Sequence, residues 1–375
     1  MPACRITPSQ LSNRKHFSIL YKEVMIIEDL QLNVALLRKR VPNLTTAAKN
    51  VGLRPATVSN LCTGKIPIGR AEVRTLVTLA NLAGCTLDEL ILRGGRLSMI
   101  ETGIKVLDLF APLVRGGTMG IIARPGMGQL VMLGELFRRV KQRSYVTILW
   151  LPKELVPGIE DCVNEAEHTC SSIDELASLV MDLRAQHDVF IGADRSTVLS
   201  GELAALRERI QMPGVMPVTI ALVDCAGESV DEDAPYGPLD TLWKFDMDLS
   251  TRHFFPAVNP IASTSIILEG AQLEANHLAV QGRARKLMRR YRELRPLVMA
   301  KGIESLTGED KMMYERGERL EAYFTQPFYI AEPYTGKAGV SVSLQETIEN
   351  VQGIMDGVAD HYDIKELTYI GKLSK

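Results

Sequence analysis

Between residues 30 and 92, apolar positions recur at the three- and four-residue spacing of short amphipathic helices joined by tight turns. This pattern predicts helices over residues 32–40, 43–53, 54–65, 68–84 and 85–92. Asn43 or Thr45 suits the N-cap of the second helix, and Pro55 lies near the first position of the third. Gly52 and Gly64 stand where these helices are expected to end. This part of the chain is therefore predicted to be all-α.

From residue 100 onward the pattern changes to continuous apolar segments of strand length, separated by amphipathic helices. Strands are predicted over Met119–Ala123 and over residues 145–152, 187–194 and 217–224. One helix is predicted to begin at Gln129, directly after a loop at residues 124–128, and another covers residues 173–185. The first strand, its glycine-containing loop and the following helix have the layout of a phosphate-binding loop.

The composition indicates a globular protein without a membrane span. With 375 residues the chain has room for two or three domains, and 46% apolar with 23% charged residues is ordinary for soluble proteins. No apolar run reaches the roughly 20 residues that a transmembrane helix needs, and the first residues contain no signal-peptide core. Six scattered cysteines show no metal-ligand spacing. We therefore expect a cytoplasmic protein with reduced thiols and without a metal site.

The charges are distributed unevenly along the chain. Residues 1–98 contain 14 Lys and Arg against 6 Asp and Glu, whereas residues 99–375 contain 29 against 39. The overall net charge of −2 therefore hides a basic first quarter and an acidic remainder. A basic segment on a separate domain favours a polyanionic partner.

The loop at residues 124–128 has the shape of a phosphate-binding loop without its chemistry. The motif requires G-x-x-x-x-G-K-[ST], and the equivalent positions here hold Ala123, Gly128, Gln129 and Leu130. Gly126 and Gly128 permit the backbone conformations that such a loop needs. Gln129, however, replaces the lysine that reaches the terminal phosphates, and Leu130 replaces the hydroxyl that holds Mg²⁺.

The sequence TTAAKNVGLRPATVSNLCTGK, followed by LVTLANLAGCTLDELIL, resembles the Cro/repressor (XRE) type of helix-turn-helix domain. The resemblance implies that the third helix enters the major groove of double-stranded DNA. The residues expected to face base edges or flanking phosphates are Arg54, Ala56, Thr57 and Asn60, and those expected near the DNA backbone are Asn43, Thr63 and Lys65. The alternative is a helical protein–protein module built on the same bundle.

The run ETGIKVLDLFAP, with RGG, MGII and PGMG after it, resembles the nucleotide-binding domain of the rotary ATP synthase beta subunit. FFPAVNPIASTS and FTQPFYIAEPYTGKAGVSVSLQETIENVQGIMDG resemble later segments of the same family. The resemblance implies a degenerate P-loop (RecA-like) α/β domain with a mainly parallel sheet, followed by a C-terminal α-helical domain. The family's N-terminal β-barrel has no counterpart, and the helix-turn-helix segment stands in its place.

The same resemblance implies a set of nucleotide-binding residues. The loop would contribute Gly126, Met127, Gly128, Gln129 and Leu130, and the adenine pocket would contain Phe255, Phe328, Ala331 and Tyr334. Glu154 matches the family's catalytic glutamate, although Leu155 replaces the arginine after it, and Asp194 matches the Walker B aspartate. The alternative for the aromatic residues is ordinary core packing, and for Asp194 a carboxylate that merely ends a strand.

The predicted organisation is a disordered arm at residues 1–27, a helix-turn-helix domain at 28–93, a linker at 94–99, an ATP synthase beta-like domain at 100–265 and a helical domain at 266–375. We interpret the chain as a DNA-binding transcriptional regulator whose second part senses an adenine nucleotide, or mediates assembly, without hydrolysis. ATP or ADP would bind weakly and without Mg²⁺, and the chain would form a dimer or a ring of six. The alternatives are a DNA-binding ATPase with residual hydrolysis and a synthase-like ring subunit.

Overall fold

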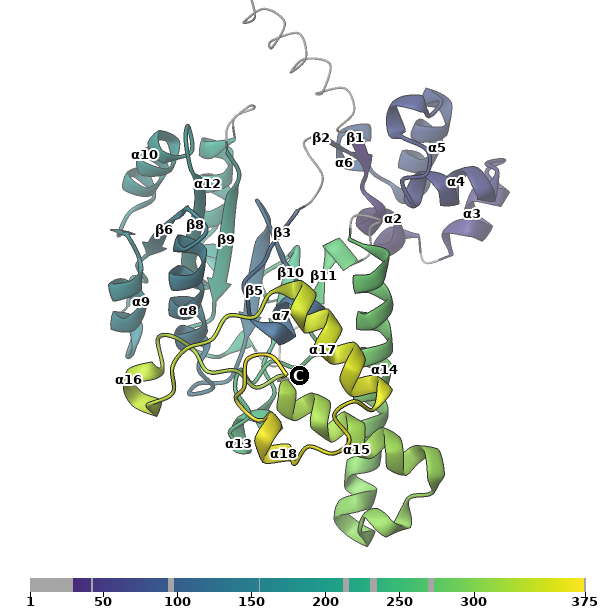
Figure 1. Ribbon diagram of the computed structural model, residues 1–375. Helices are drawn as coiled ribbons and strands as arrows, with labels where there is room; N and C mark the ends of the chain where they lie inside the picture. Colours follow the sequence, from purple (N-terminus) through teal and green to yellow (C-terminus); the bar gives the residue numbers. More distant parts are fainter. Residues whose placement is uncertain are drawn as a thin grey trace, which may run out of the picture. The chain divides into compact units, whose positions relative to one another are not determined.

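The computed structural model describes residues 30–41, 43–93, 98–154, 156–211, 216–229, 235–268 and 273–373 (Figure 1). The chain divides into two compact units, and the second comprises Met99–Leu268 and Leu273–Lys375. The described residues up to Ser98 belong to the first unit. The predicted arm at residues 1–27 and residues 94–97 of the predicted linker lie outside the described residues.

The first unit consists mainly of short helices around a small core. They are α2 (Val34–Arg40), α3 (Leu44–Asn50), α4 (Pro55–Cys62), α5 (Val73–Ala83) and α6 (Leu87–Leu90), with the 3₁₀ turn η2 (Ile68–Arg70) before α5. Leu37, Leu79 and Leu90 are fully buried at the centre of this core. Pro55 occupies the first turn of α4, as predicted, because proline at that position costs no helix hydrogen bond.

The all-α prediction for this unit is wrong in one respect, because its ends pair as a small antiparallel sheet. Strand β1 (Leu30–Leu32) lies against β2 (Ile91–Arg93), in the register that places Leu32 opposite Ile91. The side chain of Asn33 accepts a hydrogen bond from the backbone N–H of Leu36, so α2 begins only after the strand. The backbone N–H of Asn33 also donates to the carbonyl of Leu90, which fixes the strand pair to the end of α6.

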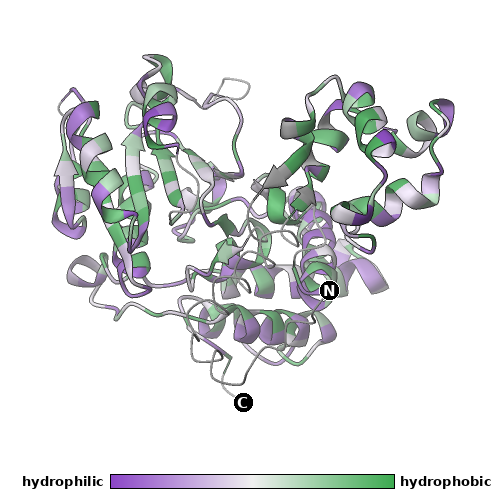
Figure 2. Ribbon diagram, turned by 90° about the horizontal axis from the view of Figure 1, so that it is seen from above, coloured by the Kyte–Doolittle hydropathy of each residue, from purple (hydrophilic) through white to green (hydrophobic). Residues whose placement is uncertain are grey.

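The second unit is organised around a mainly parallel β-sheet, as predicted. In its described part the sheet has seven strands in the order β11-β10-β5-β9-β8-β6-β7, and β11 alone runs antiparallel to its neighbour. The strands are β5 (Thr118–Ile122), β6 (Tyr145–Trp150), β7 (His168–Cys170), β8 (Asp188–Asp194), β9 (Val218–Val223), β10 (Thr241–Lys244) and β11 (Thr264–Ser265). The hydropathy colouring of Figure 2 shows largely apolar strands, which is typical of parallel sheets covered on both faces.

Helices cover both faces of this sheet. Phe190 packs toward Phe137 of α8 (Gln129–Lys141), whereas its neighbour Ile191 belongs to the core formed with α10 (Ile173–Leu183) and α12 (Glu202–Ile210). Successive residues of a strand point to opposite faces, so β8 contacts both layers. Gly192 is required here, because a Cβ atom would lie 2.6 Å from the ring of Phe137.

Three long helices near the end of the chain share one continuous core with α8 and the sheet: α14 (Ala275–Lys301), α15 (Gly308–Tyr323) and α17 (Leu344–Asp356). The short helices α16 (Glu332–Thr335) and α18 (Ile364–Leu367) lie before and after α17 in the chain. The remaining short elements are α7 (Lys105–Phe110), α9 (Ile159–Glu165), α11 (Ser196–Leu199), α13 (Met247–Thr251), η4 (Ile266–Leu268), η5 (Ile303–Ser305) and the antiparallel pair β3 (Met99–Ile100) with β4 (Leu113–Val114). Within the described ranges, none of the helices has both the length and the apolar character to cross a bilayer.

Lys105 on α7 is a fully buried lysine without a carboxylate partner in the described residues. Its ammonium donates hydrogen bonds to the carbonyls of Ile370, at 2.8 Å, and Gly371, at 3.3 Å. The same nitrogen lies 4.1 Å from the centroid of the Tyr323 ring. Burial lowers the pKa of Lys105 to about 7, because two carbonyls and an aromatic ring replace only part of the lost hydration.

We expect this lysine to make the stability of the second unit depend on pH. The unfolded chain holds the Lys105 proton up to about pH 10.4, whereas the folded chain releases it near pH 7. Between these values the unfolded state binds more protons, so stability rises with pH by at most about 1.4 kcal/mol per pH unit. Lys105→Met should abolish this rise, while the exposed Lys286→Met should keep it.

The measurement is urea unfolding between pH 7 and 9.5, followed by tryptophan fluorescence. Both tryptophans of the chain, Trp150 and Trp243, lie in the second unit, so the signal reports that unit alone. A difference in unfolding free energy between wild type and Lys105→Met that stays constant across this range would contradict the prediction.

Candidate functional site

The loop between β5 and α8 holds two glycines in left-handed conformations. Gly126 has φ of 80° and Gly128, the N-cap of α8, has φ of 89°. No side chain crowds either position, so the backbone conformation and not the space requires glycine. The side chain of Met127 is buried between them, and α8 begins at Gln129, as predicted. The loop therefore presents its backbone at the carboxyl end of β5, where parallel sheets bind ligands.

The two side chains that replace the motif's lysine and hydroxyl pack against the protein interior. Gln129 is only 6% exposed, and Leu130 packs against the main core of the second unit. The carbonyl of Leu130 accepts a hydrogen bond from the thiol of Cys162, which is itself buried. Neither side chain is suited to hold a phosphate or a metal ion.

A cavity of about 450 Å³ lies beside this loop and brings together most of the predicted nucleotide-binding residues. Those that line it are Gly126, Met127, Gly128, Phe255, Phe328 and Ala331. Further apolar lining comes from Val131, Met132, Phe245, Pro256, Ala257 and Pro327. This size, and an apolar wall with few polar groups, are typical of sites for small ligands.

Tyr334 differs from the prediction. Its side chain is 78% exposed, and its neighbour Thr335 lines the cavity instead. Thr335 lies one turn after Ala331 on α16 and donates a hydrogen bond to the Ala331 carbonyl at 2.9 Å. The helical turn thus directs Ala331 and Thr335 to the cavity and leaves the larger Tyr334 ring in solvent.

Besides Thr335, the described lining of the cavity includes four polar residues that were not predicted: His253, Gln326, Lys337 and Tyr369. The hydroxyl of Tyr369 accepts a hydrogen bond from the backbone N–H of Phe255 at 3.1 Å and donates to the carbonyl of His253. Burial raises the pKa of this phenol, so it stays protonated and can make both bonds. Tyr369 therefore fixes the backbone that carries Phe255, although 114 residues separate the two.

A buried ion pair on α8 connects the loop helix to the wall of the cavity. Glu135 and Arg139 are 2.6 Å apart, and their side chains are 0% and 2% exposed. Glu135 also accepts hydrogen bonds from the backbone N–H groups of Tyr329 and Ile330. Arg139 donates to the carbonyls of Thr102, Gly103 and Val340. The segments on both sides of α16 are thereby held against α8.

The two acidic residues matched to catalytic positions both lie at the carboxyl ends of strands in the sheet, but they make different contacts. Glu154 follows β6 and is exposed. Asp194 ends β8, which β9 separates from β5, and its two oxygens accept hydrogen bonds from the N–H groups of Ser196 and Cys225 at 2.8 Å and 3.0 Å. Burial by itself would raise the pKa of Asp194, but these hydrogen bonds outweigh it and the pKa is lowered. Leu155 lies outside the described residues.

The predicted DNA-binding residues lie on or beside α3 and α4 of the first unit. Arg54 is the N-cap of α4, and the exposed members of the set are Asn43, Arg54, Ala56, Thr63 and Lys65. Thr57 and Asn60 are half-buried on α4. A groove of about 390 Å³ between α2, α3 and α4 includes Asn43 and Thr63, together with Arg38, Thr45, Thr46 and Ser59. Hydroxyl and amide groups therefore gather on one side of the two helices.

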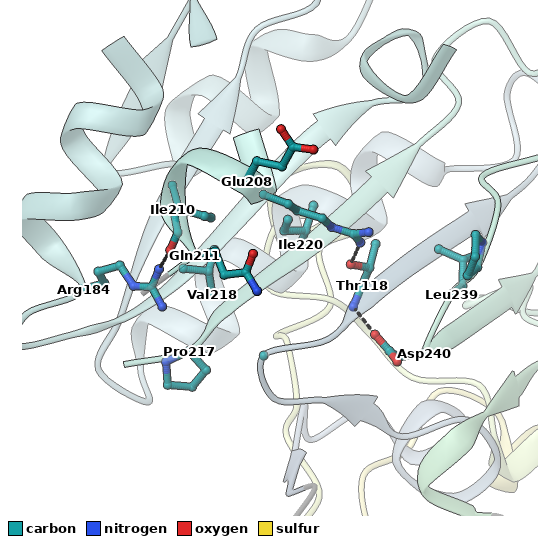
Figure 3. Close-up of a pocket in the computed structure, with 13 residues that line it drawn as sticks. Thr118, Arg184, Glu208, Ile210, Gln211, Pro217, Val218, Ile220, Leu239 and Asp240 are labelled. Carbon is teal, nitrogen blue, oxygen red and sulfur yellow. Dashed lines mark hydrogen bonds between the residues drawn. The ribbon is translucent and has the colours of Figure 1, made fainter. Parts of the chain in front are cut away.

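A second large cavity in the second unit, of about 620 Å³, lies at the amino ends of the parallel strands, opposite the carboxyl ends at which the loop lies (Figure 3). It borders the first residues of β5 and β9, and Arg184 and Arg207 line it. Both arginines already donate hydrogen bonds, Arg184 to the carbonyl of Ile210 and Arg207 to the hydroxyl of Thr118. In parallel sheets, ligands bind at the carboxyl ends of the strands. The candidate site is therefore the cavity beside the loop.

The sheet order, the loop after β5 and the helix that starts at Gln129 define the second unit as an α/β protein with the P-loop fold. Its loop keeps the glycine geometry and lacks the lysine and the hydroxyl of the motif.

Comparisons with known proteins identify relatives of this chain within that fold. The chain is 28% identical to "ATP synthase subunit beta" of Coprothermobacter proteolyticus, in an alignment of 329 residues that covers 74% of this chain and 73% of that protein. Its fold is similar to the "unique ATP synthase subunit NeqB from Nanoarcheaum equitans", with a TM-score of 0.57 and 18% identity over 72% of this chain and 80% of that one. No protein-family model matches. The chain therefore contains an ATP synthase beta-subunit-like domain, which confirms that part of the sequence interpretation.

We expect Arg139→Met to destabilise the second unit by about 3–5 kcal/mol, because it leaves the Glu135 carboxylate buried and without its partner charge. Arg138→Met is the matched control on the same helix: Arg138 is 44% exposed and lies 3.5 Å from Glu165, so its loss should cost about 0–1 kcal/mol. Urea unfolding followed by tryptophan fluorescence measures both. Equal losses in the two variants would show that the buried pair does not hold the unit together.

Proposed function

We propose that the second unit binds an adenine nucleotide in the cavity beside the loop and does not hydrolyse it. The observation that carries this proposal is that one cavity joins the loop glycines to Phe255, Phe328 and Ala331. A flat base fits between apolar and aromatic side chains, and base–aromatic stacking contributes about 1–3 kcal/mol. The similarity to an ATP synthase beta subunit supports an adenine base over other flat ligands.

The absence of hydrolysis follows from the charges that the site lacks. Phosphoryl transfer depends almost entirely on positioning and on electrostatic stabilisation of the phosphates. Losing a single stabilising donor typically slows an enzyme by about 10²–10³. Here Gln129 is buried, Leu130 is apolar, and both oxygens of Asp194 already accept backbone hydrogen bonds. The nucleotide is then held mainly by its base, with little preference for ATP over ADP and little dependence on Mg²⁺.

Calorimetric titration with ATP and ADP tests this binding mode. Phe255→Ala should weaken both nucleotides by about 5- to 150-fold, which corresponds to the 1–3 kcal/mol of one stacking interaction. Tyr334→Ala is the matched aromatic control, because that ring is exposed to solvent and should leave the affinity unchanged. Adding Mg²⁺ should not change either titration.

Two results would contradict this proposal. One is the absence of heat from any nucleotide at millimolar concentration. The other is steady ATP turnover by the wild-type protein that disappears in Glu154→Gln, because the unit would then be an ATPase. Gln129→Lys combined with Leu130→Thr restores the motif's chemistry and should increase the preference for ATP with Mg²⁺.

We further propose that the first unit binds duplex DNA, so that the chain is a DNA-binding regulator. The observation in favour is the arrangement of α3 and α4, which are joined by residues 51–54 with a left-handed Gly52 and held together by the buried Ala48, Val58 and Leu61. In helix-turn-helix proteins the second helix of such a pair enters the major groove by its N-terminal residues. Arg54 at the start of α4 is placed for this interaction, and the basic charge of residues 1–98 favours it.

Gel-shift selection on random duplexes tests the DNA proposal. Arg54→Ala combined with Asn60→Ala should weaken binding by about 1–3 kcal/mol for each base that either side chain reads, and should relax the selected sequence. Arg74→Ala removes an equal charge from an exposed position on α5 and should preserve the selected sequence. If the double variant selects the same sequence with unchanged affinity, α4 is not the recognition helix.

A further inference from the structure

The positive charge in the described lining of the cavity beside the loop is not on the loop itself. Among the described residues that line it, Lys337 is the one lysine or arginine, and no aspartate or glutamate is present. The loop end contributes Gly126, Met127 and Gly128, whose side chains are uncharged. Within this described lining, an anionic ligand therefore meets a permanent positive charge at Lys337 and not at the loop.

Contacts with Tyr369 place Lys337 near the proposed base site. The Lys337 ammonium lies 4.4 Å from the centroid of the Tyr369 ring. The hydroxyl of that same ring bonds to the backbone N–H of Phe255 and to the carbonyl of His253. One tyrosine thus contacts both the Lys337 cation and the backbone of the residue on which a base would stack.

Lys337 is also available to bind an anion. The residue is exposed, and in the described part of the chain no carboxylate lies within ion-pair distance of its ammonium. Its backbone is fixed, because Gly336 ends α16 in a left-handed conformation and the Lys337 N–H donates to the Thr335 hydroxyl at 3.3 Å. The contact with an aromatic face leaves the donor groups of the ammonium free for an oxygen anion.

We infer that Lys337, and not the loop, binds the first phosphate of the ligand, so that an adenine nucleoside monophosphate is sufficient for full affinity. This inference rests on the proposed base site. A base stacked at Phe255 brings the first phosphate toward Lys337, where a charge-assisted hydrogen bond forms. The second and third phosphates of ATP meet no further lysine or arginine among the described residues of the lining and add little affinity. AMP therefore binds at least as tightly as ATP, and both bind more tightly than adenosine.

The test compares AMP with adenosine by calorimetry in four proteins: wild type, Lys337→Met, Lys337→Arg and Lys365→Met. Methionine keeps an apolar chain that packs on the Tyr369 ring but removes the charge. Lys337→Met should weaken AMP by about tenfold, the lower end of the range for a hydrogen bond to a charged group, and leave adenosine unchanged. Lys337→Arg should retain AMP binding, and Lys365→Met, at an exposed position outside the cavity, should behave as wild type.

The salt dependence gives a second readout. Raising the ionic strength should weaken AMP binding to the wild type and have little effect on Lys337→Met, because screening acts on the charge that this variant lacks. The inference fails if AMP keeps its advantage over adenosine in Lys337→Met. It also fails if both ligands weaken equally, since that result assigns Lys337 a structural role. If neither ligand binds the wild type, the proposed base site itself is wrong.

Discussion

The buried ion pair between Glu135 and Arg139 is the constraint on which the candidate site depends. Removing two charges from water costs several kcal/mol per ion, and attraction between the pair offsets this cost only when the remaining hydrogen-bonding groups are satisfied. Here the surrounding backbone satisfies them, with N–H groups of residues 329–330 and carbonyls of residues 102, 103 and 340. The loop helix, the segment before α7 and the cavity wall therefore hold one another in place.

This arrangement separates the shape of the site from its charge. The Glu135–Arg139 pair helps to position the glycine loop and the aromatic wall, and it does not include Gln129 or Leu130. Neither of these two residues lines the cavity. The motif's lysine and hydroxyl can thus be replaced by core-packing side chains while the cavity persists. Such a site keeps the recognition of a flat apolar group and loses the stabilisation of developing charge, which is the part that catalysis requires.

The sequence predicted those features that local pattern or a contiguous motif encodes. The strand before the loop, the helix from Gln129 and the parallel sheet follow from apolar periodicity, and Phe255, Phe328 and Ala331 follow from the resemblance to the synthase family. Contacts between distant segments have no local signal. The pairing of β1 with β2 and the approach of Tyr369 to Phe255 therefore went unpredicted, and Tyr334 was placed in the cavity because the turn of α16 could not be resolved from sequence.

The partners of Lys105 have a consequence for the order in which the chain folds. Its two carbonyl acceptors lie 265 and 266 residues later in the sequence. A ribosome adds about 5–20 residues per second, so α7 is synthesised some tens of seconds before those carbonyls exist. During that interval the ammonium needs water, and α7 stays out of its final position in the core. A buried helix of the fold is thus completed by residues that are made long after it. The cavity, whose lining includes Tyr369 from the same distant segment, closes only after them.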